Sequence, residues 1–438
     1  MNTTTVSDTL AASDAIASAL ADPKTAWSAA PIEGRAWPQS LAGGAAGIAL
    51  LHIERAHSGR GDWETARTWL SLAAFGELTV AANAGLFFGA PAVAFALHAA
   101  AGASGRYRGA LARLDEAVTA LTRFRLAEAH ARIERAERPV MREFDLIRGL
   151  AGLGAYHLRR HPDHPITRDV LAYLVRLTEP LPSRGELPPW WTDVSLNGEP
   201  SPDYPHGHGN LGMAHGIGAV LALLSLAILR DLPLDGAGEA AGRICAWTDQ
   251  WRQNDSGGLW WPGFITIDQV HAQRVEPSRR PRPSWCYGIG GTARAQQLAG
   301  IALKDPARQT AAENAMLATL RDSALVERLP EIGLCHGMAG LLQSAWRIAS
   351  DAATPHIADE LPRLAARLAA RIPDPIPDPE LLDGAAGAAL ALHTIGTDTA
   401  PASHWDAFLL LARPAGAAPH GSPPMAPDQH RLPRLDRR

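Results

Sequence analysis

The chain has 438 residues, of which 46% are hydrophobic and 20% are charged, and its formal net charge is −4 at pH 7. This composition allows a large buried core, and the slight negative charge argues against a broad nucleic-acid-binding surface. Three cysteines are too few for a disulfide framework, and their odd number fits a reducing compartment. Alanine and leucine dominate over β-branched residues, which favours helices over sheets.

The first 29 residues contain neither a basic leading segment nor a long apolar core, so we expect no signal peptide. We also find no run of about 18 apolar residues, and so we expect no transmembrane span. We therefore predict a cytoplasmic protein, in which residues 1–29 form an N-terminal segment before a main domain at 30–412.

Seven segments of the main domain share one pattern, a turn of small residues followed by an apolar run rich in alanine and leucine. They lie at 40–53, 86–99, 146–158, 213–227, 285–299, 334–349 and 381–395. Their aligned first glycines are Gly44, Gly89, Gly149, Gly216, Gly288, Gly337 and Gly384. Repetition at this length predicts an array of similar supersecondary units within one domain.

Each repeat predicts the start of a buried helix. Glycine permits a tight turn and a close helix contact, and the run that follows is apolar on most faces. Intervals of 45 to 72 residues between the first glycines leave room for a second helix, such as 361–372. We therefore predict an all-α fold with inner and outer helices. A closed α/α toroid is its simplest form, although the periodicity alone does not distinguish a toroid from an open solenoid.

Three stretches depart from the repeat pattern. Residues 105–143 are strongly charged and predict a solvated outer helix, with a partner-docking face as the alternative. Residues 180–210 form a Pro/Gly-rich stretch with Trp190 and Trp191, which predicts a lid, the wall of a groove or a mobile loop. Residues 413–438 contain six prolines and several arginines, which predicts a disordered tail.

Reactive side chains are concentrated just before the glycines of repeats four to six. His215, Tyr287 and His336 come directly before a first glycine, and Cys286 and Cys335 come one position earlier. In a ring of repeats, these positions lie at the same height on adjacent helix N-termini, so the two cysteines and His336 can converge. Thiolates and imidazoles are ligands that Zn²⁺ prefers, and three protein ligands leave a fourth position open, as in catalytic sites.

Other reactive residues have simpler interpretations. Cys286 and Cys335 could be small buried core residues, as we expect for Cys245, which lies in a helical pattern away from any glycine turn. Two histidines in a Pro/Gly loop, His206 and His208, do not suggest a complete metal site. We expect Asp383, which comes before the seventh glycine, to cap a helix.

Three short motifs, in addition to the sevenfold repeat, resemble the signature of the lanthionine cyclases, the LanC family. They are WCYG at 285–288, LCHG at 334–337 and GMAHG at 212–216. The resemblance covers about residues 30–412. It implies an α/α toroid of seven inner and seven outer helices, with zinc at one end of the central cavity. The charged segment at 105–143 lies where some members carry an inserted domain, and its pattern suggests a helical connection instead.

The resemblance also implies roles for individual residues. The zinc ligands of the family fall on Cys286, Cys335 and His336. Its acid/base residues match His215 and Asp145. Its arginine, tryptophan and tyrosine around the first ligand match Arg282, Trp285 and Tyr287.

Members of this family add cysteine thiols of a precursor peptide to dehydroalanine or dehydrobutyrine residues. The resemblance therefore implies a lanthionine synthetase, a zinc-dependent lanthipeptide cyclase that forms (methyl)lanthionine thioether rings. Our hypothesis is that the substrate thiol takes the fourth zinc position and that His215 is the general acid/base. Asp145 is either a second acid/base group or the residue that orients His215. Arg282 either stabilises the enolate or fixes Asp145.

Two alternatives stay open: a LanC-like enzyme that adds glutathione to dehydrated residues, and a peptide-binding scaffold without turnover. A toroidal glycosidase would need a pair of acidic residues facing the cavity, and the cysteine–histidine set argues against it. The expected partners are a dehydrated precursor peptide with its leader, a lantibiotic dehydratase and a membrane exporter, and no nucleic acid. A complex of this kind could hold the cytoplasmic protein at the membrane.

Overall fold

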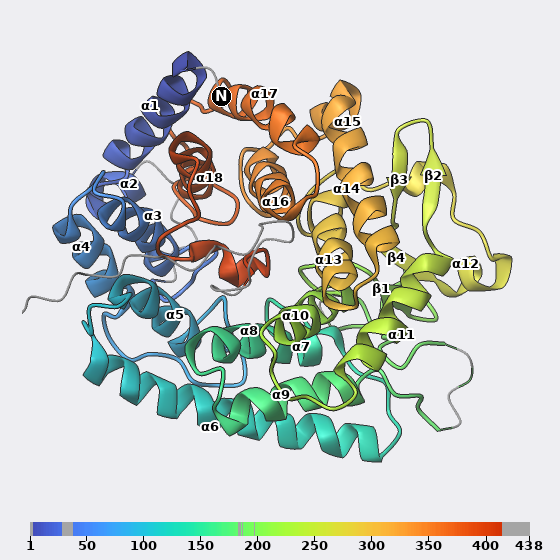
Figure 1. Cartoon of the computed structure of the whole chain (residues 1–438). Helices are drawn as coiled ribbons and strands as arrows, with labels where there is room; N and C mark the ends of the chain where they lie inside the picture. The colour runs from blue at the N-terminus through green and yellow to red at the C-terminus, as the bar shows by residue number, and fades with distance from the viewer. Residues whose placement is uncertain (1–2, 29–37, 183–184, 186, 197, 414–438) are drawn as a thin grey trace, which may run out of the picture.

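A computed structural model describes residues 3–28, 38–182, 185, 187–196 and 198–413, and its fold is an α/α toroid (Figure 1). The inner helices are α3 (Ala45–His57), α5 (Ala90–Ala101), α8 (Leu150–Arg160), α10 (Ile217–Leu229), α13 (Ile289–Ala302), α16 (Met338–Asp351) and α18 (Ala385–Thr397). The outer helices are α1 (Thr3–Ala19), α4 (Trp63–Ala73), α6 (Arg108–Glu134), α9 (Pro165–Arg176), α11 (Ala237–Gln250), α14 (Pro306–Arg321) and α17 (His356–Ala369). The prediction of seven inner and seven outer helices is confirmed.

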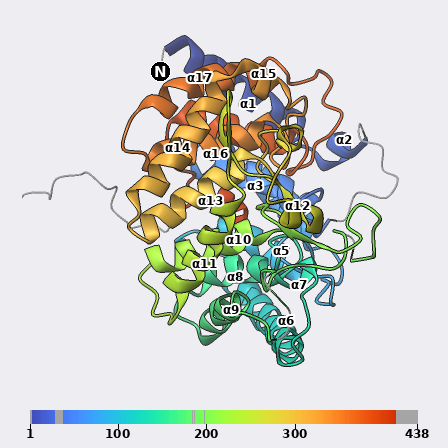
Figure 2. The same cartoon turned by 90° about the vertical axis from the view of Figure 1, so that its right-hand side faces the viewer.

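Shorter elements connect these helices. The short helices are α2 (Pro23–Ser28), α7 (Met141–Phe144), α12 (Ile267–Ala272) and α15 (Ser323–Glu327), with 3₁₀ helices η1 (Pro277–Arg279) and η2 (Trp405–Leu409). Two antiparallel sheets pair β1 (His208–Asn210) with β4 (Phe264–Thr266), and β2 (Gln253–Asp255) with β3 (Gly258–Trp260). The side view shows α7 and α12 towards the same end of the toroid (Figure 2).

The ring is closed. Each inner helix packs against the next, and α18 packs against α3, so the open solenoid is excluded. The outer helix beside α18 is α1, which also contacts α17. Residues 3–19, assigned from the sequence to a separate N-terminal segment, thus supply an outer helix of the ring.

The glycine turns explain where the inner helices begin. Each predicted first glycine is the residue that directly precedes an inner helix. In five of the seven repeats, a second glycine three positions later allows a close approach of the chain; Ala92 and Ala219 take its place in the other two. A Cβ added to Gly340 would lie 1.9 Å from the carbonyl oxygen of Leu334, and one added to Gly47 would lie 2.1 Å from that of Leu41. Only glycine fits these two positions without moving the backbone.

Backbone hydrogen bonds join the turns before the inner helices from one repeat to the next. They connect Leu146 to Ala214, Ala214 to Cys286, Cys286 to Cys335, Cys335 to Leu382, Leu382 to Ala42, and Leu41 to Phe87. These bonds hold the residues in front of the glycines side by side at one end of the toroid. They are the physical reason why side chains far apart in the sequence can form one site.

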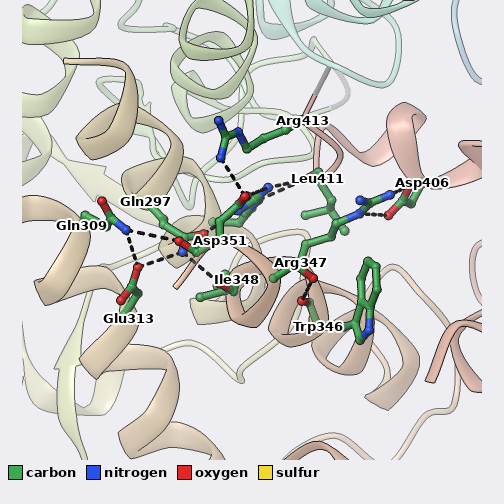
Figure 3. Close-up of polar contacts among 12 residues, drawn as sticks. Gln297, Gln309, Glu313, Trp346, Arg347, Ile348, Asp351, Asp406, Leu411 and Arg413 are labelled. Carbon is green, nitrogen blue, oxygen red and sulfur yellow. Dashed lines mark hydrogen bonds and ion pairs between the residues drawn. The ribbon is translucent and has the colours of Figure 1, made fainter. Parts of the chain in front are cut away.

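After α18 the chain returns to the centre of the ring (Figure 1). Asp406 accepts hydrogen bonds from Arg347 at 2.6 and 2.7 Å and from Gln343 at 2.7 Å. Arg413 pairs with Asp351 at 2.8 Å (Figure 3). We call residues 402–413 the central segment. The rest of the predicted tail, 414–438, lies outside the described residues.

Two further expectations have clear outcomes. Most of the charged stretch at 105–143 forms the outer helix α6, as expected. Trp190 and Trp191 are both buried, and Trp191 Nε1 donates to the carbonyl of His206 at 3.1 Å, so both tryptophans have a packing role. Across the described part of the chain, none of the helices has the length and hydropathy needed to cross a bilayer.

Candidate metal centre

Two neighbouring turns bring Cys286, Cys335 and His336 together. Cys286 comes two residues before Gly288, the residue that precedes α13, and donates its backbone N–H to the carbonyl of Cys335 at 3.1 Å. Cys335 and His336 come just before α16. The ligand atoms of the three side chains all lie within 4.8 Å of one another. Cys286 is buried, and the other two are partly exposed.

The donor set fits a zinc ion. Bonds of about 2.3 Å to sulfur and 2.0 Å to nitrogen place tetrahedral donors less than about 4 Å apart, which small side-chain movements can reach here. Asp383 Oδ1 lies 3.4 Å from His336 Nδ1. A carboxylate beside a ligating imidazole is a common supporting contact in zinc sites, since it orients the ring.

The two thiols interact directly with each other. Hydrogen bonding with Cys335 lowers the pKa of Cys286 to about 5 against the opposing effect of burial, and His336 contributes in the same direction. The hydrogen bond with Cys286 and burial raise the pKa of Cys335. The hydrogen bond with Cys286 also raises the pKa of His336. A divalent cation at this position would favour the ionisation of both thiols.

His215 lies on the turn next to Cys286, and its ring is held by Asp145. The distance between His215 Nδ1 and Asp145 Oδ2 is 2.6 Å. Asp145 is buried, and its Oδ1 accepts the backbone N–H of Arg148 at 2.7 Å. Because the carboxylate occupies Nδ1, it fixes the imidazole and leaves Nε2 for chemistry. Of the two roles expected for Asp145, a second acid/base group or the residue that orients His215, this geometry fits the second.

Arg282 and Tyr287 have partners that the sequence did not indicate. Arg282 forms an ion pair with Glu331 at 3.0 Å, and both side chains are partly exposed. The hydroxyl of Tyr287 accepts a hydrogen bond from Asn210 at 3.4 Å. The ring of Tyr287 stacks on Phe264, with 4.9 Å between ring centroids. Burial raises the pKa of Tyr287, so its phenol stays protonated.

Sequence reasoning missed two contacts of the metal centre. Asp383 was expected to cap a helix, yet it lies beside His336. The signal was available, because Asp383 precedes Gly384 in the same way that His336 precedes Gly337. The second contact, Trp285 Nε1 donating to the carbonyl of Leu409 at 3.1 Å, depends on the central segment and has no sequence signal.

Comparisons with known proteins agree with this architecture. A family model described as lanthionine synthetase C-like protein matches residues 35–410. The chain is 23% identical over 209 residues to the nisin biosynthesis protein NisC of Lactococcus lactis subsp. lactis, an alignment that covers 46% of this chain and 48% of that protein. The chain thus spans about half the length of this curated relative.

A solved structure, nisin cyclase, has a TM-score of 0.71 and 19% sequence identity, and the match covers 85% of this chain and 92% of that one. At this identity, the likeness establishes the fold. The family model covers most of the chain and includes both cysteine turns and the His215 turn. The chain therefore belongs to the lanthionine synthetase C-like family.

Proposed function

We propose that this chain is a zinc-dependent lanthipeptide cyclase. It adds cysteine thiols of a dehydrated precursor peptide to dehydroalanine or dehydrobutyrine and forms lanthionine or methyllanthionine. The observation that carries the proposal is the placement of Cys286, Cys335 and His336 beside the His215–Asp145 pair, on neighbouring turns of one ring. The printed names of the two relatives, a nisin biosynthesis protein and a nisin cyclase, support it.

Cys286, Cys335 and His336 would hold the zinc, which when bound supplies a positive charge that keeps a thiol ionised near neutral pH. The addition forms a carbon–sulfur bond, converts the carbon–carbon double bond to a single bond and requires a proton at the α-carbon. The proton of the thiol is released. Negative charge develops on the neighbouring carbonyl oxygen before the α-carbon is protonated.

We assign the delivery of this proton to His215 through Nε2, because Asp145 holds Nδ1. The protonated phenol of Tyr287 and the partly exposed guanidinium of Arg282 are hydrogen-bond donors for the developing charge. Asp145 acts through His215 and is a positioning residue in this scheme. A dehydratase must act before this chain, because unmodified serine and threonine have no double bond to attack.

The test combines metal analysis with a cyclisation assay. Purified protein should contain about one zinc per chain. With a dehydrated precursor peptide, it should remove the free thiols of the peptide without changing the peptide mass, as measured by mass spectrometry after thiol alkylation. Thiols that persist with zinc-loaded protein would contradict the proposal. A mass increase of one glutathione, seen only when glutathione is added, would support the alternative enzyme instead.

A further inference from the structure

A large groove opens next to the candidate acid/base pair. It has a volume of about 910 Å³ and lies between the turns before α3, α5 and α8 on one side and α6 on the other. Its rim includes Ile147 and Arg148. Since the backbone N–H of Arg148 donates to Asp145, the groove adjoins the site.

The groove marks the one junction of the ring that is held differently. At six junctions, the turns of neighbouring repeats share backbone hydrogen bonds. Between the second and third repeats, we find no such backbone hydrogen bond among the described residues. A side chain from the outer helix α6 connects the two turns instead. The guanidinium of Arg125 donates to the carbonyls of Ala82 and Arg148. The groove therefore reaches the face of the toroid that carries the metal centre, beside this bridge.

The walls of the groove carry an excess of positive charge. The charged lining residues are Arg125, Arg132, Arg135, Arg142, Arg148, Glu128 and Glu143. Arg132 pairs with Glu143 at 2.6 Å, and Arg135 pairs with Glu137 at 2.8 Å. Arg142 and Arg148 are exposed, and neither has a carboxylate partner among the described residues.

Two exposed apolar side chains lie close in sequence to Arg125 and Ala82, which are joined by the hydrogen bond described above. Phe124 is 56% exposed and directly precedes Arg125, and Val80 is 48% exposed and comes two residues before Ala82. Neither residue lines the groove, but Phe124 lies on α6 and Val80 on the stretch before α5, two segments that form its walls. Exposed apolar side chains on such segments are typical of a surface that binds a peptide or protein. A partner that offers both carboxylates and apolar side chains would match this surface.

We propose that this groove binds an acidic segment of the peptide substrate, outside the residues that form the thioether ring. The proposal rests on the proposed function and adds a substrate class to it, a peptide with carboxylates next to apolar residues. Arg142 and Arg148 bind the carboxylates, and the groove leads the chain past Asp145 to the metal centre. A nucleic acid is the less fitting occupant, because it needs a row of phosphate contacts, and of the lining arginines only Arg142 and Arg148 are exposed without a paired carboxylate or bridging role.

Direct binding tests the proposal without any turnover. The probe is a fluorescein-labelled peptide in which glutamate alternates with leucine and serine, and its partner probe has glutamine at every glutamate. Fluorescence anisotropy at low salt should show the acidic probe binding about tenfold tighter, and added salt should reduce the difference. Arg142→Glu and Arg148→Glu should each weaken the acidic probe about threefold or more.

The control variant is Arg252→Glu, at an exposed arginine outside the groove lining, which should bind the acidic probe as the wild type does. Melting curves and zinc content show whether each variant is folded. Equal binding of both probes, or an equal loss in the Arg252 variant, would overturn the proposal. A labelled single strand of deoxythymidine that binds more tightly, and that loses affinity in the same variants, would replace the peptide with a nucleic acid.

The outcome is separate from that of the cyclisation assay. Charge-dependent binding without cyclisation would retain the groove and overturn the enzyme. Cyclisation with charge-independent binding would retain the enzyme and overturn the groove.

Discussion

Asp383 is placed to support the candidate metal centre from outside the proposed ligand set. Its carboxylate lies 3.4 Å from Nδ1 of His336, on the turn of the next repeat. The imidazole can bind a cation only in a limited range of ring orientations, and a neighbouring carboxylate restricts the ring to that range. The affinity for zinc should therefore depend on the seventh repeat, although that repeat provides no ligand.

Replacing Asp383 with alanine should weaken zinc binding about 10- to 100-fold, because the ring of His336 loses its neighbouring carboxylate. Competition with a chromogenic chelator at neutral pH measures the affinity. Asp378→Ala is the matched control: Asp378 accepts the backbone N–H of Glu380 before the same helix, and its loss should leave zinc affinity unchanged. Wild-type affinity in the Asp383 variant would show that the carboxylate does not support the metal centre.

The roles of His215 and Asp145 can be separated by kinetics. His215→Gln should lower the cyclisation rate about 10²- to 10⁴-fold, since proton transfer to the α-carbon is lost. Zinc content should stay at the wild-type level, because His215 is not a ligand in our proposal. Asp145→Asn should lower the rate less, because His215 Nε2 is still present, and should shift its pH dependence, because the negative charge beside the imidazole is lost. A wild-type rate in the His215 variant would remove the acid/base assignment.

A residue of this site could be predicted from the sequence where its position follows from the glycine repeat that contains it. The convergence of Cys286, Cys335 and His336 could be predicted because each comes one or two residues before a helix-opening glycine. The partners Glu331 and Leu409 could not be found, because they reach Arg282 and Trp285 through packing between repeats and through the central segment. No periodicity in one repeat encodes such contacts.

At the scale of elements, the central segment is the main feature that the sequence did not predict. Residues 402–413 have no helical or strand periodicity, and their partners lie on several inner helices. Glu54 on α3 accepts the backbone N–H groups of Ala402 and Ser403 at 2.9 and 2.8 Å. Arg294 on α13 donates to the carbonyl of Leu411 at 2.7 Å. The inner helices therefore enclose a segment of the chain, and polar residues inside the ring are satisfied by it.

The Arg347–Asp406 pair should be important for stability. Burial raises the pKa of Asp406, but Arg347 and Gln343 outweigh burial, and the net pKa lies below the usual value. Asp406→Ala leaves the buried guanidinium without its partner and should cost about 3–5 kcal/mol of unfolding free energy. Denaturant titration measures this loss.

The control for this prediction is the partly exposed pair of Arg321 and Glu360, at 2.9 Å. Glu360→Ala should change the unfolding free energy by about 1 kcal/mol or less, because Arg321 is more than half exposed and solvent can replace the lost carboxylate. The double variant Arg347→Met/Asp406→Leu should be more stable than Asp406→Ala, since it removes both charges together. Equal losses in Asp406→Ala and Glu360→Ala would contradict the importance of the buried pair.

At the scale of the whole molecule, ring closure requires both ends of the chain. The glycine repeat predicted seven similar units, but it could not predict that α18 meets α3 or that α1 covers α18. Each unit has an apolar inner helix that is buried on most sides, and a terminal unit in an open array would leave one side exposed. Closure removes that exposed side, which is the physical reason for the ring.

The buried histidines also predict how the whole molecule responds to acid. His52, His157, His208 and His393 are buried, and burial lowers their pKa values to about 4, 3, 4 and 4. In the unfolded chain the value is about 6.5. At a pH between these values, the unfolded state binds protons that the folded state does not. The unfolding free energy is therefore not reduced by these histidines above about pH 6.5, and it falls as the pH decreases below that value. The slope is about 1.4 kcal/mol per pH unit for each histidine.

Denaturant titrations at several pH values between 7.5 and 5, with a chelator present throughout so that zinc loss does not contribute, should show this decrease. His393→Leu should reduce the slope by about one proton and should make the protein relatively more stable at pH 5, because His393 has no hydrogen-bond partner for either ring nitrogen among the described residues. His271→Leu, at an exposed position of α12, should leave the slope as it is. A slope that is the same in the wild type and in His393→Leu would mean that this histidine is protonated inside the folded ring, and the link between burial and acid lability would fail for it.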